Sequence, residues 1–177
     1  MSKELGKDMN GVQKVMTGPA YLADALGQVP LNSISVLTGQ MTYFYTNEVG
    51  MAAAAVGTVL LVAKIVDAIT DLIMGKIVDN TNSKYGKARP WLLRMIIPVM
   101  VALVILFTVP KANEGIQLGY ALLTNIFVSA ICYTAIAVPF YTMMAYKTKS
   151  SEEKGKMGTY RSAVGYAIGV ALGIGLI

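Results

Sequence analysis

Histidine is absent from this chain of 177 residues, and cysteine occurs once, as Cys132 within an apolar run. Without histidine, imidazole acid–base chemistry is excluded. A single cysteine provides neither a disulfide framework nor a thiolate metal site. Charged residues are scarce at 14%, whereas 55% of the residues are hydrophobic. With a mean hydropathy of +0.56, the chain is too apolar for an ordinary soluble domain and is predicted to be an integral membrane protein.

The N-terminal residues lack the short apolar core and small-residue cleavage site of a removable signal peptide. The first membrane span is therefore expected to remain in the mature protein. Residues 1–19 are polar with mixed charge, which predicts a short, disordered cytoplasmic lead.

Apolar runs of about 20 residues, the length that crosses a bilayer, predict five spans. We place them at residues 20–45, 51–77, 91–110, 117–145 and 159–177. Of the 15 Lys and Arg residues, all except Lys64 and Lys111 then fall in the lead or in the segments that follow the second and fourth spans, edges included. The positive-inside rule places the N-terminus in the cytoplasm, with the protein in the inner (plasma) membrane. The net charge of +5 is thus a topology signal, and we expect membrane lipid as a partner but not nucleic acid.

The strongest functional signal lies in residues 57–91. Lys64, Asp67 and Asp71 are inside the second span at steps of three and four, so they share one helix face with Thr70 beside them. A charge that faces lipid at mid-bilayer costs about 2.5–3.5 kcal/mol, so this face must look into protein or water. Two desolvated carboxylates one turn apart need a proton, a lysine or a small cation, and Na⁺ suits carboxylate and hydroxyl oxygens. The alternative is a static Lys64–Asp67 salt bridge that locks helices together.

The first span carries a polar stripe whose members recur at steps of four, three and four: Gln28, Asn32, Ser35 and Gly39. Lipid offers no hydrogen-bond partner, so the stripe must face a cavity or another helix. Hydrogen bonding between helices is the alternative to a binding role. Pro30 is expected to bend this helix, and Asp24, near its cytoplasmic end, is expected to be a water-exposed carboxylate.

Polar groups return in the fourth span, at Asn125, Ser129 and Tyr133, and then at Tyr141. Tyrosine offers an apolar face and a hydroxyl, which suits a sugar ring, although structural packing explains these positions equally well. Residues 146–156 are interpreted as a solvated charge run between spans. In the fifth span, Gly165, Gly169 and Gly173 recur at steps of four, which favours close helix contact.

Five spans, the last of them incomplete, do not supply the pair of repeats between which transporters place their midplane sites. We therefore expect the chain to be an N-terminal fragment of a longer one.

The segment KIVDAITDLIMGKIVDNTNSKYGKARPW, residues 64–91, resembles the second span and following loop of the glycoside–pentoside–hexuronide:cation symporters. This is the melibiose permease and glucuronide carrier family of the major facilitator superfamily. The likeness extends through YFYTNEVG, CYTAIAVPFY and TYRSAVG and covers most of residues 20–170. It implies an all-α polytopic helix bundle, the N-terminal part of a major facilitator superfamily fold. It also implies a symporter rather than an enzyme, with no cofactor beyond the coupling ion.

The resemblance implies a cation site. Asp67 and Asp71 match the paired cation-binding aspartates of the family, with Thr70 at a polar position and Thr134 as a hydroxyl donor from the fourth span. Lys64 matches a basic residue that is usually arginine. The coupling cation would be Na⁺ or H⁺, exchanged by alternating access.

The resemblance also implies a substrate site. Tyr133, Tyr141 and Arg161 match positions near the sugar. Where melibiose carriers have sugar-binding aspartates, this chain has Val29 and Ala137, so a melibiose-like galactoside is not expected and a uronide or pentoside is. Replacement hydrogen bonds would come from Gln28 and Asn32. The competing interpretation is a non-transporting membrane protein, a receptor or assembly subunit, whose intramembrane charges are structural.

Overall fold

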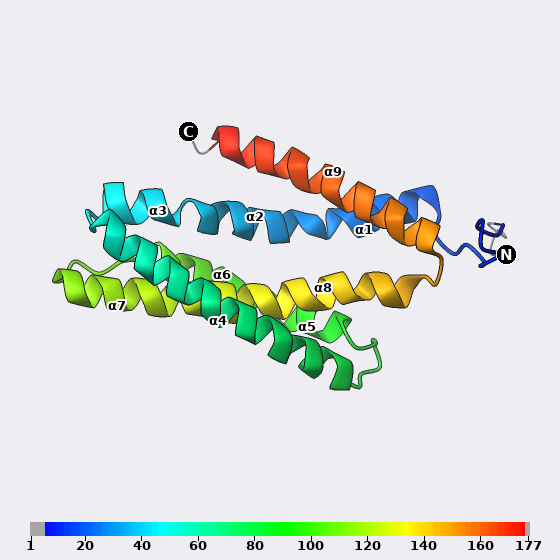
Figure 1. Cartoon of the computed structure of the whole chain (residues 1–177), viewed down its shortest axis with the longest axis horizontal. Helices are drawn as coiled ribbons and strands as arrows, with labels where there is room; N and C mark the ends of the chain where they lie inside the picture. Colours follow the sequence, from blue (N-terminus) through cyan, green and yellow to red (C-terminus); the bar gives the residue numbers. More distant parts are fainter. Residues whose placement is uncertain (1–5, 176–177) are drawn as a thin grey trace. The chain divides into compact units, whose positions relative to one another are not determined.

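Helices account for the architecture of residues 6–175, the part of the chain that the computed structural model describes. Strands are absent from these residues, apart from one isolated antiparallel bridge between Lys7 and Gln13. The predicted all-α fold class is confirmed. The α-helices, shown in Figure 1, are α1 (Gly18–Leu26), α2 (Gln28–Gly39), α3 (Met41–Tyr43), α4 (Ala53–Asn80), α5 (Arg89–Arg94), α6 (Ile96–Leu106), α7 (Glu114–Asn125), α8 (Thr134–Lys147) and α9 (Ser151–Gly175). Two π-helical segments, η1 (Phe44–Glu48) and η2 (Ile126–Tyr133), complete the set.

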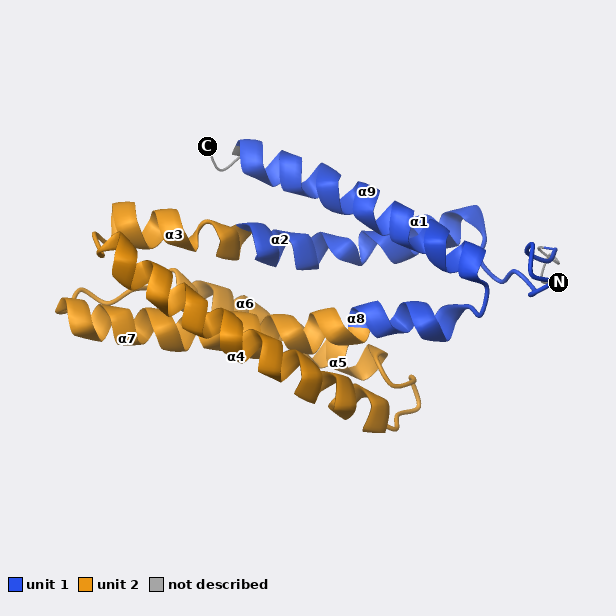
Figure 2. Cartoon of the chain, in the orientation of Figure 1, with its two compact units in different colours: residues 1–36, 140–177 blue, residues 37–139 orange. Residues whose placement is uncertain are grey.

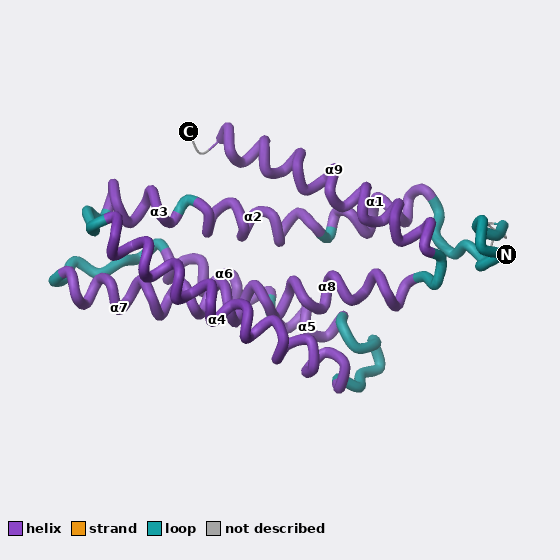
Figure 3. The backbone as a smooth tube through the Cα atoms, in the orientation of Figure 1, coloured by secondary structure: helices purple, strands orange, loops and turns teal. Residues whose placement is uncertain are grey.

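The helices break near prolines, as the tube in Figure 3 shows for α1 and α2. α1 ends before Gly27, three residues ahead of Pro30. Proline has no N–H to donate to the carbonyl four residues earlier, and its ring crowds that carbonyl. The same reason accounts for the break between α5 and α6 at Met95, three residues before Pro98. Residues 20–45 therefore form a series of short helices rather than one continuous helix.

Within residues 6–175, two helices are long and apolar enough to cross a membrane, namely Ala53–Asn80 and the continuous run Glu114–Lys147 formed by α7, η2 and α8. α4 has 28 residues, which corresponds to about 42 Å at 1.5 Å per residue and exceeds the roughly 30 Å of a bilayer core. Ile96–Leu106 is a shorter apolar helix.

The chain divides into two compact units, coloured separately in Figure 2. Unit 1 comprises residues 1–36 and 140–177, and unit 2 comprises residues 37–139. Each is described by itself below.

In unit 2, α4 packs against α7 and η2, and α6 packs against the same two elements. Apolar side chains of α4, Met74 and Val78, form a buried cluster with Ala135 of α8. A buried polar contact supplements this packing, because Asn125 Nδ2 donates to the hydroxyl of Tyr45 at 2.8 Å and to the carbonyl of Ala121 at 2.9 Å. Both protons of this amide are thereby used inside the unit.

In unit 1, α1 packs against α9. The rings of Tyr21 and Tyr160 stack between these helices with centroids 5.6 Å apart. Residues 6–17 precede α1 and form a small turn, in which Asp8 N donates to Val12 O and Lys14 N donates to Gly6 O. The expected disordered lead is therefore wrong for residues 6–17, because local hydrogen bonds order them. Residues 1–5 lie outside the described part of the chain.

The interpretation of residues 146–156 as a solvated charge run is also wrong. α8 extends to Lys147 and α9 begins at Ser151, so only residues 148–150 connect them. Ser150 and Glu153 are buried, and Glu153 N donates to Ser150 Oγ at 3.4 Å. This is part of the S-x-x-E pattern that starts a helix.

Tyr45→Phe is expected to destabilise unit 2, because Asn125 loses the acceptor for one of its two amide protons. We expect a loss of about 1 kcal/mol in the free energy of unfolding, which lowers Tm by roughly 2–4 °C. Thermal unfolding in detergent measures this. Tyr43→Phe, which removes the hydroxyl of an exposed tyrosine, is the control and should leave Tm unchanged; equal shifts for the two variants would contradict the proposed role of the Asn125 contact.

Candidate functional site

The charged face of α4 meets the start of α8 within unit 2. Thr134 Oγ1 lies 2.8 Å from Asp71 Oδ1 and 3.2 Å from Asp67 Oδ1. Lys64 Nζ donates to the other carboxylate oxygen of Asp67, Oδ2, at 3.1 Å. The structure thus brings together three of the four residues predicted to bind the cation, Asp67, Asp71 and Thr134, with their predicted charge partner Lys64.

One hydroxyl proton cannot serve all the oxygens around Thr134. Its Oγ1 also lies 3.3 Å from the carbonyl oxygen of Ser129, and a threonine hydroxyl has one proton to donate. When Thr134 donates its proton to Asp71, no proton lies between Thr134 Oγ1 and Asp67 Oδ1. These two electron-rich oxygens then repel each other at 3.2 Å. Such an arrangement is stabilised by an added positive charge, either a proton on a carboxyl group or a bound cation.

The π-helical segment η2 ends directly before Thr134. π-Helical turns are rare and occur frequently at functional sites. Thr134 is buried although its hydroxyl faces two carboxylates of another helix. The local geometry of η2 therefore presents a buried hydroxyl to α4.

The remaining groups on this face are less enclosed. The side chain of Lys64 is 75% exposed, whereas that of Asp67 is 15% exposed, and Asp71 is exposed. Thr70 donates its hydroxyl proton to backbone carbonyls of its own helix, those of Asp67 at 2.9 Å and Val66 at 3.1 Å, so this proton is not available to the carboxylates. Among the described residues no group of three or more acidic, cysteine or histidine side chains could hold a metal ion.

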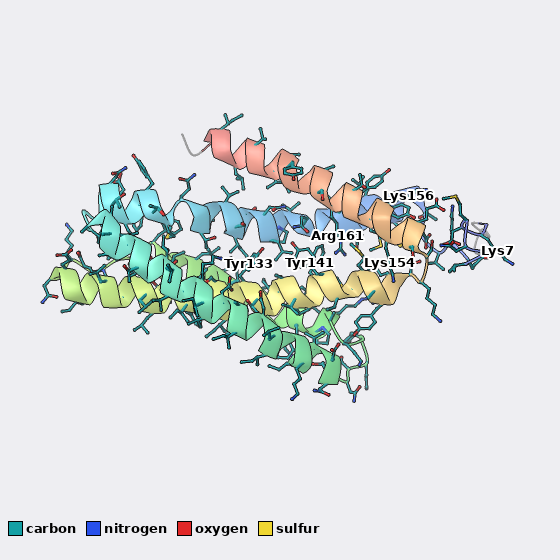
Figure 4. All side chains as sticks on the ribbon, in the orientation of Figure 1. Lys7, Tyr133, Tyr141, Lys154, Lys156 and Arg161 are labelled. Atoms are coloured by element: carbon teal, nitrogen blue, oxygen red, sulfur yellow. The ribbon has the colours of Figure 1, made fainter. Side chains whose placement is uncertain are left out.

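A pocket of about 270 Å³ lies in unit 1, and four of the residues predicted for substrate binding line it: Gln28, Asn32, Tyr141 and Arg161. Figure 4 labels Tyr141 and Arg161, which come from α8 and α9. Gln28 Nε2 donates to the hydroxyl of Tyr141 at 3.1 Å. The fifth predicted residue, Tyr133, is half-buried at the end of η2 in unit 2.

Two amide atoms beside this pocket are buried and have no hydrogen-bond partner within the described chain, namely Gln28 Oε1 and Asn32 Nδ2. One is an acceptor and the other a donor. A buried polar atom without a partner costs free energy that a ligand or water can recover. The pair therefore offers complementary hydrogen-bonding positions to a polar molecule.

Asp24 is not the water-exposed carboxylate expected from the sequence. Its side chain is 1% exposed because it accepts two hydrogen bonds from Arg161, from Nε at 2.7 Å and Nη2 at 3.0 Å. Lys147 forms a second ion pair with the same carboxylate. The guanidinium of Arg161 also stacks over the ring of Phe140, 4.1 Å from its centroid. Asp24 thus fixes the orientation of Arg161. The sequence feature that could have indicated this role is an acidic residue inside an apolar run.

Comparison with known proteins agrees with the resemblance seen in the sequence motifs. A family model described as MFS/sugar transport protein matches residues 24–176. The isoprimeverose transporter of Lactiplantibacillus pentosus is 35% identical over 133 residues, which cover 75% of this chain and 28% of that protein. The glucuronide carrier protein homolog of Escherichia coli (strain K12) is 33% identical over 119 residues, covering 67% of this chain and 26% of that protein. An inner membrane symporter of the same organism is 28% identical over 149 residues, covering 84% and 32%.

The chain therefore spans about a third or less of the length of these relatives. The family resemblance itself is confirmed.

Gly165→Ala and Gly169→Ala are expected to differ in their effect on stability. A Cβ at Gly165 would lie 2.6 Å from Asn32 Nδ2, whereas a Cβ at Gly169 meets nothing within 4 Å. Alanine at position 169 should stabilise α9 by about 0.5–1 kcal/mol. At position 165 the forced movement of Asn32 cancels this gain and changes the pocket. Thermal unfolding in detergent compares the two, and stabilisation of both to the same extent would show that Asn32 moves freely.

Asp24 and Arg161 are expected to be energetically coupled. Asp24→Ala leaves two buried or half-buried cations facing each other and should cost about 3–5 kcal/mol. Arg161→Ala should cost less, because Lys147 still pairs with Asp24. The double variant should lose less than the sum of the two, by about 0.5–3 kcal/mol. Thermal unfolding of the unmodified protein, the two single variants and the double variant measures this coupling. Strictly additive losses in the free energy of unfolding would contradict a direct ion pair.

Proposed function

The chain belongs to the MFS/sugar transport protein family of integral membrane transporters, and we propose that it serves the cation-coupled symport of a sugar or glycoside. Asp67, Asp71 and Thr134 would hold the cation, and the pocket of unit 1 would hold the sugar. Transport would proceed by alternating access, with the binding energy of both solutes driving the change between states. The observation that carries the proposal is the pair of carboxylates that share the single hydroxyl of Thr134. A transporter of this kind needs no cofactor.

The charge on α4 favours a singly charged cation. Asp67 and Asp71 supply two negative charges, and Lys64 supplies one positive charge at 3.1 Å from Asp67. The remaining single negative charge is neutralised by one Na⁺ or one proton. The oxygen donors suit Na⁺, because hard cations prefer carboxylate and hydroxyl oxygens. A proton on one carboxyl group would equally relieve the contact with Thr134.

The pocket of unit 1 suits a polyhydroxylated ligand. Tyr141 provides an aromatic ring with a hydroxyl, and Gln28 and Asn32 provide an unpartnered acceptor and donor. Sugar hydroxyls both donate and accept, so they can satisfy both amide atoms. The relatives named for isoprimeverose and glucuronide define the two substrate classes that we propose for this chain, a pentose-containing glycoside and a uronide. The positive-inside distribution of Lys and Arg supports a cytoplasmic N-terminus.

The Lys64–Asp67 ion pair favours the competing function, a membrane protein whose charges only connect helices. This pair is weak support, because one partner is 75% exposed and exposed pairs contribute about 0–1 kcal/mol. It also leaves Asp71 unexplained, since Asp71 forms no ion pair within residues 6–175. Under this alternative, replacing Lys64 and Asp67 together by leucine is tolerated and no cation alters ligand binding.

Uptake by cells that express the full chain tests the proposal. Labelled isoprimeverose and a labelled glucuronide are supplied under an imposed Na⁺ gradient and, separately, under a proton gradient. Asp71→Asn should abolish accumulation against the gradient while the protein still reaches the membrane. Thr134→Val should raise the half-saturating cation concentration about tenfold, the effect of losing one hydrogen bond to a charged group.

Thr58→Val is the matched control, because its hydroxyl is exposed and bonds only to the carbonyl of Ala54 on the same helix. It should transport like the unmodified chain. If Asp71→Asn still accumulates the sugar in a cation-dependent way, the proposed cation site is wrong. If Thr58→Val weakens the cation dependence as much as Thr134→Val does, the effect comes from hydroxyl removal in general.

A further inference from the structure

Residues 6–17, termed the strap, are an ordered turn fastened to α9 within unit 1. Asp8 organises the strap, since its Oδ1 accepts from the amides of Asn10 at 2.9 Å and Val12 at 2.8 Å. Gly11 has a φ of +77°, which favours glycine at the turn. The other carboxylate oxygen, Asp8 Oδ2, accepts from the hydroxyl of Ser150 at 2.6 Å. Ser150 is 0% exposed, so this bond is shielded from water.

Glu153 is the second and larger anchor of the strap. Its Oε1 accepts from the amides of Met16 at 2.7 Å and Val15 at 2.9 Å, and from the hydroxyl of Tyr21 at 3.4 Å. Its Oε2 accepts from the hydroxyl of Thr148. The side chain is almost fully buried. A single carboxylate of α9 thus holds the end of the strap, the first turns of α1 and the turn between α8 and α9.

Charged groups surround this anchor without pairing with it. Glu152 forms ion pairs with Lys14 of the strap and with Lys156 one turn along α9, both at 2.9 Å. Figure 4 labels Lys7 of the strap and Lys156 of α9. Among the described residues Glu153 forms no ion pair, so its charge is compensated by neutral donors. Removing it therefore removes hydrogen bonds to backbone amides, whereas removing Glu152 removes only partly exposed ion pairs.

The contacts between α1 and α9 continue from this anchor to the pocket. Beyond Glu153 come the stacked rings of Tyr21 and Tyr160, and then the ion pair of Asp24 with Arg161. Arg161 lines the pocket together with Ser162. The strap, α1 and the pocket wall are therefore joined by one uninterrupted row of contacts along α9.

We propose that the strap is a clip, which holds α1 against α9 through Glu153 and thereby fixes the wall of the pocket of unit 1. With the clip fastened, α1 keeps Asp24 on Arg161, and Arg161 stays in the pocket wall. With the clip released, α1 separates from the start of α9, Asp24 leaves Arg161, and the wall of the pocket around Arg161 changes shape. The proposal uses the shape of the pocket and not the identity of its ligand, so it can fail while the proposed function stands.

Two measurements on the full chain in detergent test the clip. Hydrogen exchange measures the protection of the backbone amides of Val15 and Met16, which should fall at least tenfold in Glu153→Ala. The state of the pocket wall is measured as the rate at which a methanethiosulfonate reagent modifies Ser162→Cys, an exposed position that lines the pocket beside Arg161. A Cys132→Ala background ensures that no other thiol reacts. Glu153→Ala should change this rate at least fivefold, because Arg161 moves.

Glu152→Ala is the matched control, as it removes a neighbouring carboxylate of the same helix and should change both readouts less than twofold. Glu153→Gln retains an acceptor oxygen for the two amides and should restore most of the protection. If Glu153→Ala does not fold, Ser150→Ala carries the test, since it releases Asp8 while leaving Glu153 in place, and it should give smaller changes in the same direction. Unchanged amide protection would overturn the clip, and lost protection with an unchanged modification rate would overturn its effect on the pocket wall.

Lowering the pH should release the clip, but only below the pH range in which an ordinary glutamate is protonated. Burial raises the pKa of Glu153, and the hydrogen bonds from Thr148, Met16 and Val15 lower it by more, so that the net pKa lies below its usual 4.5. The hydrogen bond from Ser150 is the main cause that lowers the pKa of Asp8. A lowered pKa in the folded state adds stability that is present above the unfolded value and is lost as the pH falls through the folded value. Protection of the two amides should therefore be constant from about pH 8 to 5; a loss near pH 7 would contradict the assignment of Glu153 as the anchor.

Discussion

A carboxylate taken out of water must be compensated, and this requirement shapes both units of the molecule. The structure contains three such arrangements. Asp24 is enclosed by two cations, Arg161 and Lys147. Glu153 is enclosed by neutral donors, two of them backbone amides. Asp67 and Asp71 receive only one exposed lysine and one shared hydroxyl. The first two arrangements are complete and therefore structural, whereas the third is incomplete, which is why we propose a cation there.

Much of the fold could be predicted from the sequence, because apolar runs of bilayer length dominate it. The long helix α4 and the run Glu114–Lys147 follow directly from such runs. The breaks at Gly27 and Met95 could have been placed from Pro30 and Pro98, since each proline disturbs the turn before it. The π-helical segment η2 has no comparable signal, because no particular residue type in Ile126–Tyr133 marks it.

The candidate site was predictable to the extent that its residues lie close together on one helix. Asp67 and Asp71 share a face by spacing alone, whereas Thr134 came from the family resemblance. The role of Asp24 was missed because its partner Arg161 is distant in sequence, although two lone opposite charges inside apolar spans favour pairing. The order of the strap was missed as well. Its signals were the Asn10–Gly11 turn and the S-x-x-E pattern that begins at Ser150.

The wide turns of η2 have a consequence for how one helix can perform two tasks. Nine residues separate Asn125 from Thr134, and on a regular α-helix this is about two and a half turns, which would point the two side chains in opposite directions. A π-helix uses more residues for each revolution. Asn125 reaches the hydroxyl of Tyr45 in η1, and Thr134 reaches the carboxylates of α4, which adjoins η1. The winding of η2 thus brings a structural contact at Asn125 and a hydroxyl shared by two carboxylates at Thr134 to adjoining elements of unit 2.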